Sequence, residues 1–177
     1  DSKIDKEFII SIINAYCPKY IFKPKNLKYN FNNYKYFFEF DLYNSYVTKI
    51  KLDFKVNKNL AILLPTSGST GSPKFVRISY KNLYSNCNSI ISYLGITRNH
   101  KTITTLPFSY SYGLSIINIH INTGASIVIN SSAMTEKKFW KSVKEYKVNS
   151  FAGVPFNFEI LKKIKFTGVK FPNLKYV

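Results

Sequence analysis

Cysteine and long apolar runs are both scarce in this chain. Cys17 and Cys87 are its only cysteines, and neither has a second cysteine or a histidine at metal-ligand spacing, which excludes a disulfide framework and a CxxC-type zinc site. A reducing, cytoplasmic location is therefore expected. The most apolar stretch, GLSIINIHINTGASIVI, is interrupted by polar side chains and is too broken for a membrane span. The chain also opens without a methionine or a signal peptide, so we expect a piece of a longer protein.

Arginine is equally scarce, although the chain is strongly basic. The formal net charge is +17, yet only Arg77 and Arg98 are arginines. Surfaces that bind nucleic acids usually recruit guanidinium groups for phosphates and base edges, and the lysines here stand singly or in pairs, without a block of five or more. We therefore expect a solvated, lysine-rich surface and no specific nucleic-acid partner. A lysine-rich nucleic-acid-binding α/β domain stays as an alternative.

Hydrophobic residues make up 45% of the chain and aromatic residues 17%, which is enough for a real core. Periodicity predicts helices at 4–16, 79–95, 112–124, 135–147 and 155–164, and strands at 19–22, 36–43, 46–54, 60–65, 74–79, 101–108, 125–130, 148–155 and 173–177. The alternation predicts an α/β fold with a mainly parallel sheet covered by helices. Ligands are expected at the carboxyl ends of its strands.

Particular residues are expected to end these elements or to face the core. Ser79 and Thr135 are the expected N-caps, Gly95 and Gly124 the helix stops, and Pro155 the first residue of its helix. In the helix at 135–147 the inward side chains are expected to be Phe139, Trp140, Val143 and Tyr146. The apolar run LAILLP, residues 60–65, indicates a strand covered on both faces.

The segment TSGSTGSPK, Thr66–Lys74, lacks the bulky apolar and aromatic side chains that are common in the rest of the chain. Its glycines allow a ligand close to the main chain, its hydroxyls and successive amides form a nest for anions, and Lys74 adds a positive charge. A Walker A loop is excluded, because Pro73 and Phe75 stand where that motif has glycine and serine or threonine. We expect a loop between two strands that binds a polyphosphate; an ordinary solvated turn is the alternative.

Thr66–Lys74 closely resembles, at nine consecutive positions, the signature phosphate loop of the adenylate-forming enzymes. These are the acyl- and aryl-CoA synthetases, the adenylation domains of peptide synthetases, and the luciferases. The segment TTLPFSYSYGLS looks like their next motif, which lines the acid pocket. Phe75 departs from the family, which usually has glycine there. The similarity covers Leu60–Val177 well and the first 59 residues loosely.

The resemblance implies an ATP-dependent, AMP-forming acid ligase that uses Mg²⁺ and makes an acyl-adenylate, which is then passed to the thiol of CoA or of a carrier-protein phosphopantetheine. It implies that ATP is bound by Thr66, Ser67, Gly68, Ser69, Thr70, Gly71 and Lys74. It implies that the carboxylic-acid substrate is bound by Tyr110, Tyr112, Val154 and Pro155. Tyr110 stands where amino-acid-activating members carry aspartate, and a phenol does not neutralise an ammonium group at pH 7, so an α-amino acid is disfavoured.

The resemblance also implies that residues 1–177 form a single partial domain, a fragment of the large N-terminal domain that is inactive alone. The C-terminal domain is absent from these residues, and the catalytic residues are expected beyond residue 177. An acyl carrier protein and a second copy of the chain are candidate partners. A catalytically degenerate scaffold stays as an alternative, because of Phe75 and Tyr110. His100 and His120 have no partner at motif spacing, and we interpret both as structural.

Overall fold

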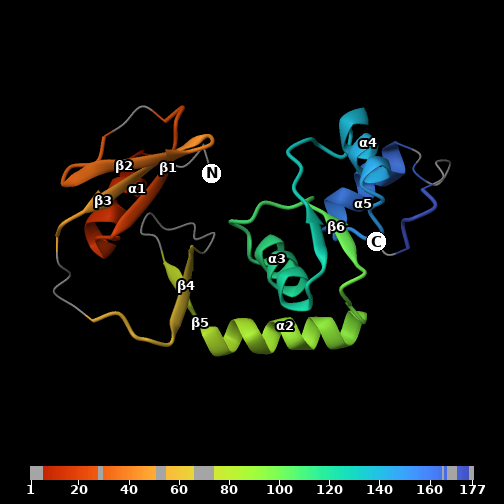
Figure 1. Cartoon of the computed structure of the whole chain (residues 1–177), viewed down its shortest axis with the longest axis horizontal. Coiled ribbons are helices and arrows are strands. Elements are labelled where there is room, and N and C mark those ends of the chain that lie inside the picture. The colour runs from red at the N-terminus through yellow and green to blue at the C-terminus, as the bar shows by residue number, and fades with distance from the viewer. Residues whose placement is uncertain are drawn as a thin grey trace. The chain divides into compact units, whose positions relative to one another are not determined.

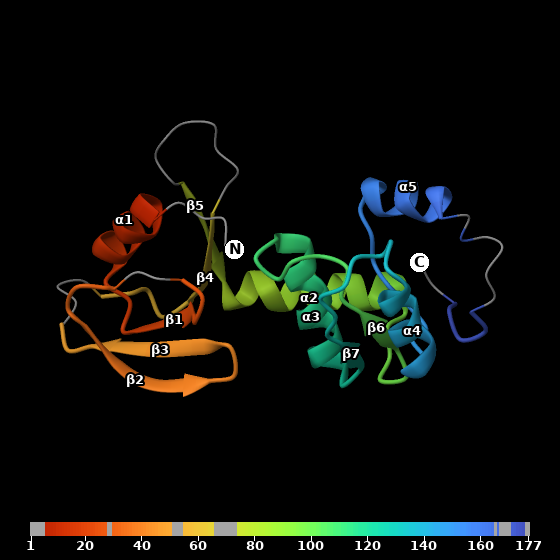
Figure 2. The ribbon, with the colours of Figure 1, turned by 90° about the horizontal axis from the view of Figure 1, so that it is seen from above.

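The computed structural model describes residues 6–27, 30–50, 55–65, 74–164, 166 and 171–175. The chain divides into two compact units with separate sheets (Figure 1, and Figure 2 from above). The first unit comprises Asp1–Lys58 and Ser67–Lys74, and the second comprises Asn59–Thr66 and Phe75–Val177. The expectation of a single partial domain over residues 1–177 stays a prediction.

The first unit is a helix followed by a three-stranded antiparallel sheet. Its elements are α1 (Lys6–Tyr16), β1 (Tyr20–Pro24), β2 (Tyr34–Phe40) and β3 (Tyr43–Thr48), with β3 between the other two strands. The ammonium group of the buried Lys23 lies 5.2 Å from the ring centroid of Tyr46 and 5.9 Å from that of Phe31. Attraction to these rings offsets part of the cost of burying the charge.

The second unit carries the segments on which the sequence predicted a site. Its elements are β4 (Leu60–Pro65), β5 (Phe75–Ser79), α2 (Tyr80–Leu94), β6 (Lys101–Ile103), α3 (Ser111–Thr123), β7 (Ser126–Val128), α4 (Lys137–Glu145) and α5 (Pro155–Lys163). β4 pairs antiparallel with β5, whereas β6 pairs parallel with β7. A parallel bridge between Thr102 and Ser150 adds a third segment beside β6.

The predicted α/β class is confirmed, but a mainly parallel sheet is not. Among the described strands, β1 with β3, β2 with β3, and β4 with β5 are antiparallel pairs. Only β6, β7 and the segment at Ser150, which are separated by helices, run parallel. The connections explain part of this: β2 and β3 are joined by a tight turn and fold back on each other, whereas a parallel pair needs a crossover of a dozen or more residues, which α3 supplies between β6 and β7.

The helix boundaries follow local capping chemistry. Ser79 caps α2, where its hydroxyl accepts from the Asn82 amide at 3.1 Å and Asn82 Oδ1 accepts from the Ser79 amide at 3.0 Å. Gly95 and Gly124 end α2 and α3 in the left-handed conformation, and Pro155 opens α5. These predictions are confirmed. No helix in the described part of the chain combines the length and apolar character needed to cross a bilayer.

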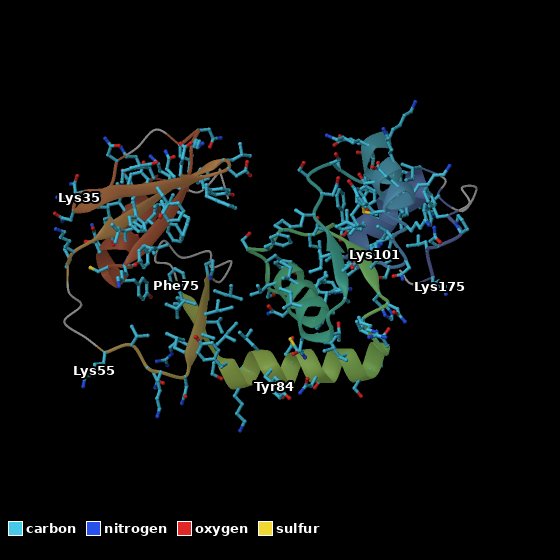
Figure 3. The ribbon with its side chains drawn as sticks, in the orientation of Figure 1. Lys35, Lys55, Phe75, Tyr84, Lys101 and Lys175 are labelled. Atoms are coloured by element: carbon cyan, nitrogen blue, oxygen red, sulfur yellow. The ribbon has the colours of Figure 1, made fainter. Side chains whose placement is uncertain are left out.

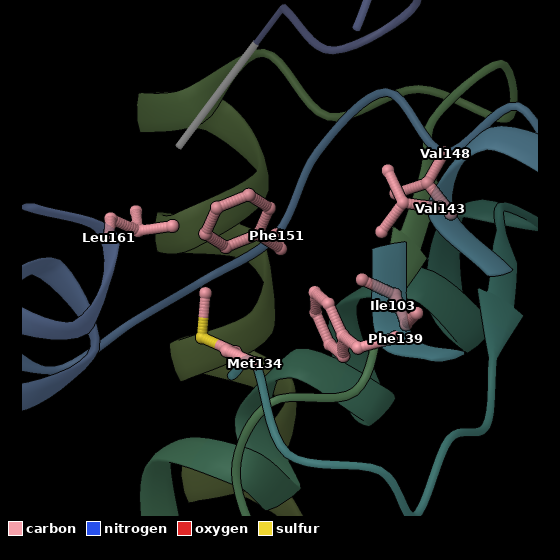
Figure 4. Close-up of a cluster of buried hydrophobic side chains, with 7 residues drawn as sticks. All are labelled: Ile103, Met134, Phe139, Val143, Val148, Phe151 and Leu161. Carbon is pink, nitrogen blue, oxygen red and sulfur yellow. The ribbon is translucent and has the colours of Figure 1, made fainter. Parts of the chain in front are cut away.

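The core of the second unit lies between the parallel segments and helices α4 and α5. Figure 4 shows its seven buried side chains, which are Ile103, Met134, Phe139, Val143, Val148, Phe151 and Leu161. Trp140 packs beside them, and its indole Nε1–H donates to the Met134 carbonyl at 2.7 Å. Successive strand residues face opposite sides of a sheet. Ile103 therefore faces this core, whereas Thr102 faces a cavity lined by α2 and α3.

Several predictions about termini and burial are wrong. α4 begins after Glu136 instead of Thr135, because the Glu136 carboxylate accepts from the Ala133 amide at 2.7 Å and organises the turn before the helix. Tyr146 is 49% exposed, since it lies beyond the last turn of α4. β4 is only half-buried, because it belongs to a two-stranded sheet. Residues 173–175 form no strand, although the Lys175 amide donates to the Asn149 carbonyl at 2.9 Å.

Candidate functional site

The predicted phosphate loop joins the ends of a hairpin. Pro65, the last residue of β4, pairs with Phe75, the first residue of β5. Phe75 is labelled in Figure 3. The expectation that the chain leaves Lys74 on a strand, and not on a helix, is confirmed. Lys74 is exposed directly before β5. The other predicted ATP-binding residues, Thr66, Ser67, Gly68, Ser69, Thr70 and Gly71, lie outside the described residues.

The second motif forms a turn that leads directly into α3. The Tyr110 amide donates to the Pro107 carbonyl at 3.1 Å, and the Leu114 amide donates to the Tyr110 carbonyl at 2.9 Å. Tyr110 is the N-cap of α3, with φ −93° and ψ 136°, and makes no side-chain cap. Gly113 is buried against Pro107, where a β-carbon would overlap the carbonyl oxygen. The motif therefore fixes the start of α3 mainly through backbone contacts, to which the Ser115 hydroxyl adds a bond to the Tyr112 carbonyl at 2.8 Å.

The four predicted acid-pocket residues occupy different surroundings. Tyr112 is 40% exposed and lines two cavities, one against the sheet and one against the β4–β5 hairpin. Tyr110 is 52% exposed at the start of α3. Val154 is half-buried in a third hollow, and Pro155 is exposed at the start of α5. Their roles in substrate binding stay predictions.

Polar side chains gather at the carboxyl ends of the parallel segments, in a hollow of about 530 Å³. Thr104 and Thr105 follow β6, and Asn130 to Ser132 follow β7. The Thr104 hydroxyl donates to the Asn130 carbonyl at 3.1 Å and accepts from the Asn130 amide at 2.9 Å. The Thr105 hydroxyl donates to the Ala152 carbonyl. The sequence analysis predicted ligands at this edge of the sheet but did not single out these residues. The pattern that could have identified them is a polar run, Thr-Thr or Asn-Ser-Ser, just after a predicted strand.

A second, mostly apolar cavity of about 260 Å³ lies on the other face of β6, against α2 and α3. His100 and His120 both line it. His100 Nδ1 accepts from the Thr97 amide at 3.0 Å, which fits the expected structural role. His120 is 3% exposed, and its Nδ1 lies 2.7 Å from the Ile116 carbonyl oxygen.

The surroundings of His120 favour the uncharged form of its ring. Burial lowers its pKa, the Ile116 hydrogen bond opposes this shift, and the neighbouring His100 adds to it. Its Nε2 is buried and has no hydrogen-bond partner in the part of the chain that the structure describes. Sequence reasoning missed this cavity, because nothing in the periodicity shows which polar atoms a helix leaves without a partner.

Comparison with known proteins defines the class. The fold is similar to that of the solved O-succinylbenzoate coenzyme A synthetase of Bacillus subtilis in complex with AMP, with a TM-score of 0.56 and 24% identity over 66% of this chain and 29% of that chain. The sequence matches the family described as AMP-binding enzyme over residues 26–176. The chain belongs to this family of adenylate-forming enzymes.

Two curated relatives are similar over more than half of the chain. The acyl-CoA ligase gloD of Glarea lozoyensis is 29% identical over 106 residues, which are 58% of this chain and 18% of the relative. The oxalate–CoA ligase of Arabidopsis thaliana is 25% identical over 121 residues, which are 66% of this chain and 24% of the relative. The chain thus spans about a fifth to a quarter of the length of these relatives.

Proposed function

We propose that the intact protein is an AMP-forming acid–thiol ligase. It activates a carboxylic acid with ATP as an acyl-adenylate and passes the acyl group to a thiol. The observation that carries the proposal is the combination of Thr66–Lys74, which matches the family's phosphate loop at nine positions, with the paired strand ends at Pro65 and Phe75. A hairpin that fixes both ends of the loop limits the conformations that it must give up on binding a phosphate chain.

In this proposal the loop binds the phosphates of ATP. Its amides and the hydroxyls of Ser67, Ser69 and Thr70 hold the β- and γ-phosphates, and Lys74 supplies charge or fixes the loop. No group of three or more histidine, cysteine, aspartate or glutamate side chains converges in the part of the chain that the structure describes. In this proposal Mg²⁺ would be held through the phosphate oxygens of the bound ATP.

The substrate class follows from Tyr110 and from what surrounds α3. The phenol of Tyr110 offers no charge to an ammonium group, so the proposed substrate is a carboxylic acid without an α-amino group. Tyr112 lies at the same end of α3 and lines an apolar cavity. The proposed acceptor is the thiol of CoA or of the phosphopantetheine of an acyl carrier protein.

ATP–pyrophosphate exchange with the intact protein and a panel of carboxylic acids tests the proposal. We expect exchange that depends on ATP, Mg²⁺ and one class of acid, followed by release of AMP when a thiol is added. The isolated 177-residue chain should show none. Absence of exchange with every acid, under conditions in which the intact protein binds ATP, would reject catalysis.

That outcome would instead support a non-catalytic member of the family. Phe75 favours this second candidate, because a large side chain in a paired strand stands where the family usually has glycine. Phe75→Gly in the intact protein separates the two candidates: an active enzyme keeps its exchange activity, whereas a scaffold stays inactive in both forms.

A further inference from the structure

One face of the three-stranded sheet in the first unit is aromatic. Residues that pair directly across neighbouring strands lie on the same face of a sheet, and the bulge in β2 adds one more ring to this face, whose centroid lies 5.2 Å from that of Phe38. The face, which we call the aromatic face, carries Tyr20, Phe22, Phe37, Phe38, Phe40 and Tyr43.

The opposite face is covered by a helix. Tyr46 of the central strand lies on that face, because successive strand residues alternate. Its ring centroid is 5.8 Å from that of Phe31, and Phe31 lines a hollow together with Ile10 and Ile13 of α1. In Figure 2, α1 lies on one side of the three strands. The aromatic face is therefore the side of the sheet that points away from α1.

The four phenylalanines of the aromatic face are between 41% and 71% exposed. With about 200 Å² for a complete side chain, they present on the order of 450 Å² of apolar surface. A patch of this size is among the largest that soluble monomers expose, and such patches often bind something. Phe22 and Phe38 flank Ser45 of the central strand, which is buried, and their ring centroids are 6.2 Å apart. The rings thus form a continuous surface.

The charged side chains beside these rings are basic. Lys35, labelled in Figure 3, is exposed on the aromatic face. The ammonium group of Lys19 lies 5.4 Å from the ring centroid of Tyr20. Of the nearby acidic residues, Glu39 lies on the opposite face and Asp41 in the turn between β2 and β3. The face is therefore complementary to a partner that is apolar and negatively charged.

The surface of an anionic lipid bilayer has both properties. Aromatic rings enter the boundary between headgroups and acyl chains, and lysines are attracted to anionic headgroups. A second copy of this face would offer Lys19 and Lys35 no acidic partner among its described residues. Stacked bases need separate, open ring platforms, whereas the ring of Phe38 meets those of Phe22 and Phe37 edge to face.

We propose that the aromatic face binds the surface of an anionic lipid bilayer. Its phenylalanines lie in the boundary between headgroups and acyl chains, and Lys19 and Lys35 contact the headgroups. This binding is peripheral. It goes beyond the proposed ligase function and does not depend on it, since it needs neither ATP nor a carboxylic acid.

Sedimentation of the intact protein with lipid vesicles tests the binding. One set of vesicles is phosphatidylcholine alone, and in the other a third of the lipid is phosphatidylserine. We expect at least about 10-fold tighter binding to the anionic vesicles, which weakens as salt is added. Equal binding to both sets would overturn the proposal. So would no binding to either set, because the rest of the intact chain or a second copy then covers the face.

Two matched pairs of variants assign the binding to this face. Phe40 and Tyr36 are exposed rings of β2 on opposite faces. Phe40→Ser should weaken vesicle binding at least about 10-fold, and Tyr36→Ser should leave it unchanged. Lys35→Gln should weaken it about 5-fold, whereas Lys6→Gln, at an exposed position in α1, should not. Equal effects within either pair would overturn the assignment.

A second measurement keeps an aromatic ring in place and so does not rely on the serine variants. Phe40→Trp and Tyr36→Trp are mixed with anionic vesicles that contain brominated phosphatidylcholine. The bromine should quench the added emission of Phe40→Trp only, and quenching of both or of neither would contradict insertion of this face. Binding of a single-stranded oligonucleotide in place of vesicles, if Phe40→Ser abolished it, would assign the face to nucleic acid and overturn the proposal.

Discussion

Gly113 lies directly against the backbone of Pro107, with no room between them for a β-carbon. An ideal β-carbon on Gly113 would overlap the Pro107 carbonyl oxygen and lie 3.2 Å from the Leu106 carbonyl oxygen. Both obstacles are main chain of the turn that opens α3, and that turn is also bonded to Tyr110. A helix residue at this place must therefore be glycine, for steric reasons and not for its freedom in φ.

Gly113→Ala should destabilise the intact protein by about 1–3 kcal/mol, because the turn must move to admit one methyl group. This sign is opposite to that of the usual glycine-to-alanine change in a helix, which stabilises by up to about 1 kcal/mol. Asn122→Ala, at an exposed position in the last turn of α3, is the control and should be neutral or slightly stabilising. Urea unfolding of both variants provides the comparison, and a stabilised Gly113→Ala would contradict the contact.

The side-chain amide of Asn149 makes two hydrogen bonds to the backbone beside β6, as a peptide group of a neighbouring strand would. Its Oδ1 accepts from the Lys101 amide at 2.8 Å, and its Nδ2 donates to the Asn99 carbonyl at 2.9 Å. Asn149→Ala should cost about 1–3 kcal/mol by leaving the part-buried Lys101 amide without a partner. Asn99→Ala is the matched control, since only the main-chain carbonyl of Asn99 takes part. Hydrogen–deuterium exchange of the β6 amides should rise in the first variant only; equal protection in both would refute the bridge.

His120 should make stability depend on pH below neutrality. Burial lowers the pKa of its ring in the folded protein, whereas the unfolded chain has the ordinary value of about 6.5. Between the two values the unfolded state binds more protons, so the free energy of unfolding falls as pH decreases from about 6.5. Chemical unfolding at about pH 7.5 and about pH 5.5 measures this loss.

His120→Asn should remove part of that pH dependence, because its side chain does not titrate. His100→Asn should retain most of it, because burial, the largest cause of the lowered pKa of His120, is unchanged. If His120→Asn and the unmodified protein lose the same free energy over this range, His120 is not the group responsible.

Lys74→Ala should weaken the use of ATP by the intact protein about 10- to 100-fold in kcat/KM, which corresponds to the loss of one charge-assisted hydrogen bond. Gly71→Val should have a comparable effect, because a β-carbon would block the approach of phosphate to the main chain. Lys81→Ala, at an exposed position in α2, removes the same charge elsewhere and should leave ATP use unchanged. Unchanged kinetics in Lys74→Ala and Gly71→Val would reject the assignment of the loop.

The sequence alone determined the features that depend on neighbouring residues. Ser79, Gly95, Gly124 and Pro155 end or begin helices as predicted, because capping bonds and backbone conformations act over a few residues. The family, too, could be identified from one contiguous segment, Thr66–Lys74. The prediction of the N-cap was wrong for α4, where the N-cap is Glu136 and not Thr135. The Glu136 carboxylate accepts from the Ala133 amide and so organises the turn before the helix.

Only the tertiary structure decided what depends on distant segments. The pairing of β4 with β5, the exposure of Tyr146 and the space around Gly113 all follow from which elements meet. The same holds for His120, which the sequence shows only as a polar residue on an apolar helix. Its bond to Ile116 is local, but its burial against β6 and the segment at Ser150 depends on how α3 packs. Its burial, and the lack of a hydrogen-bond partner for its Nε2 among the described residues, are properties of that packing.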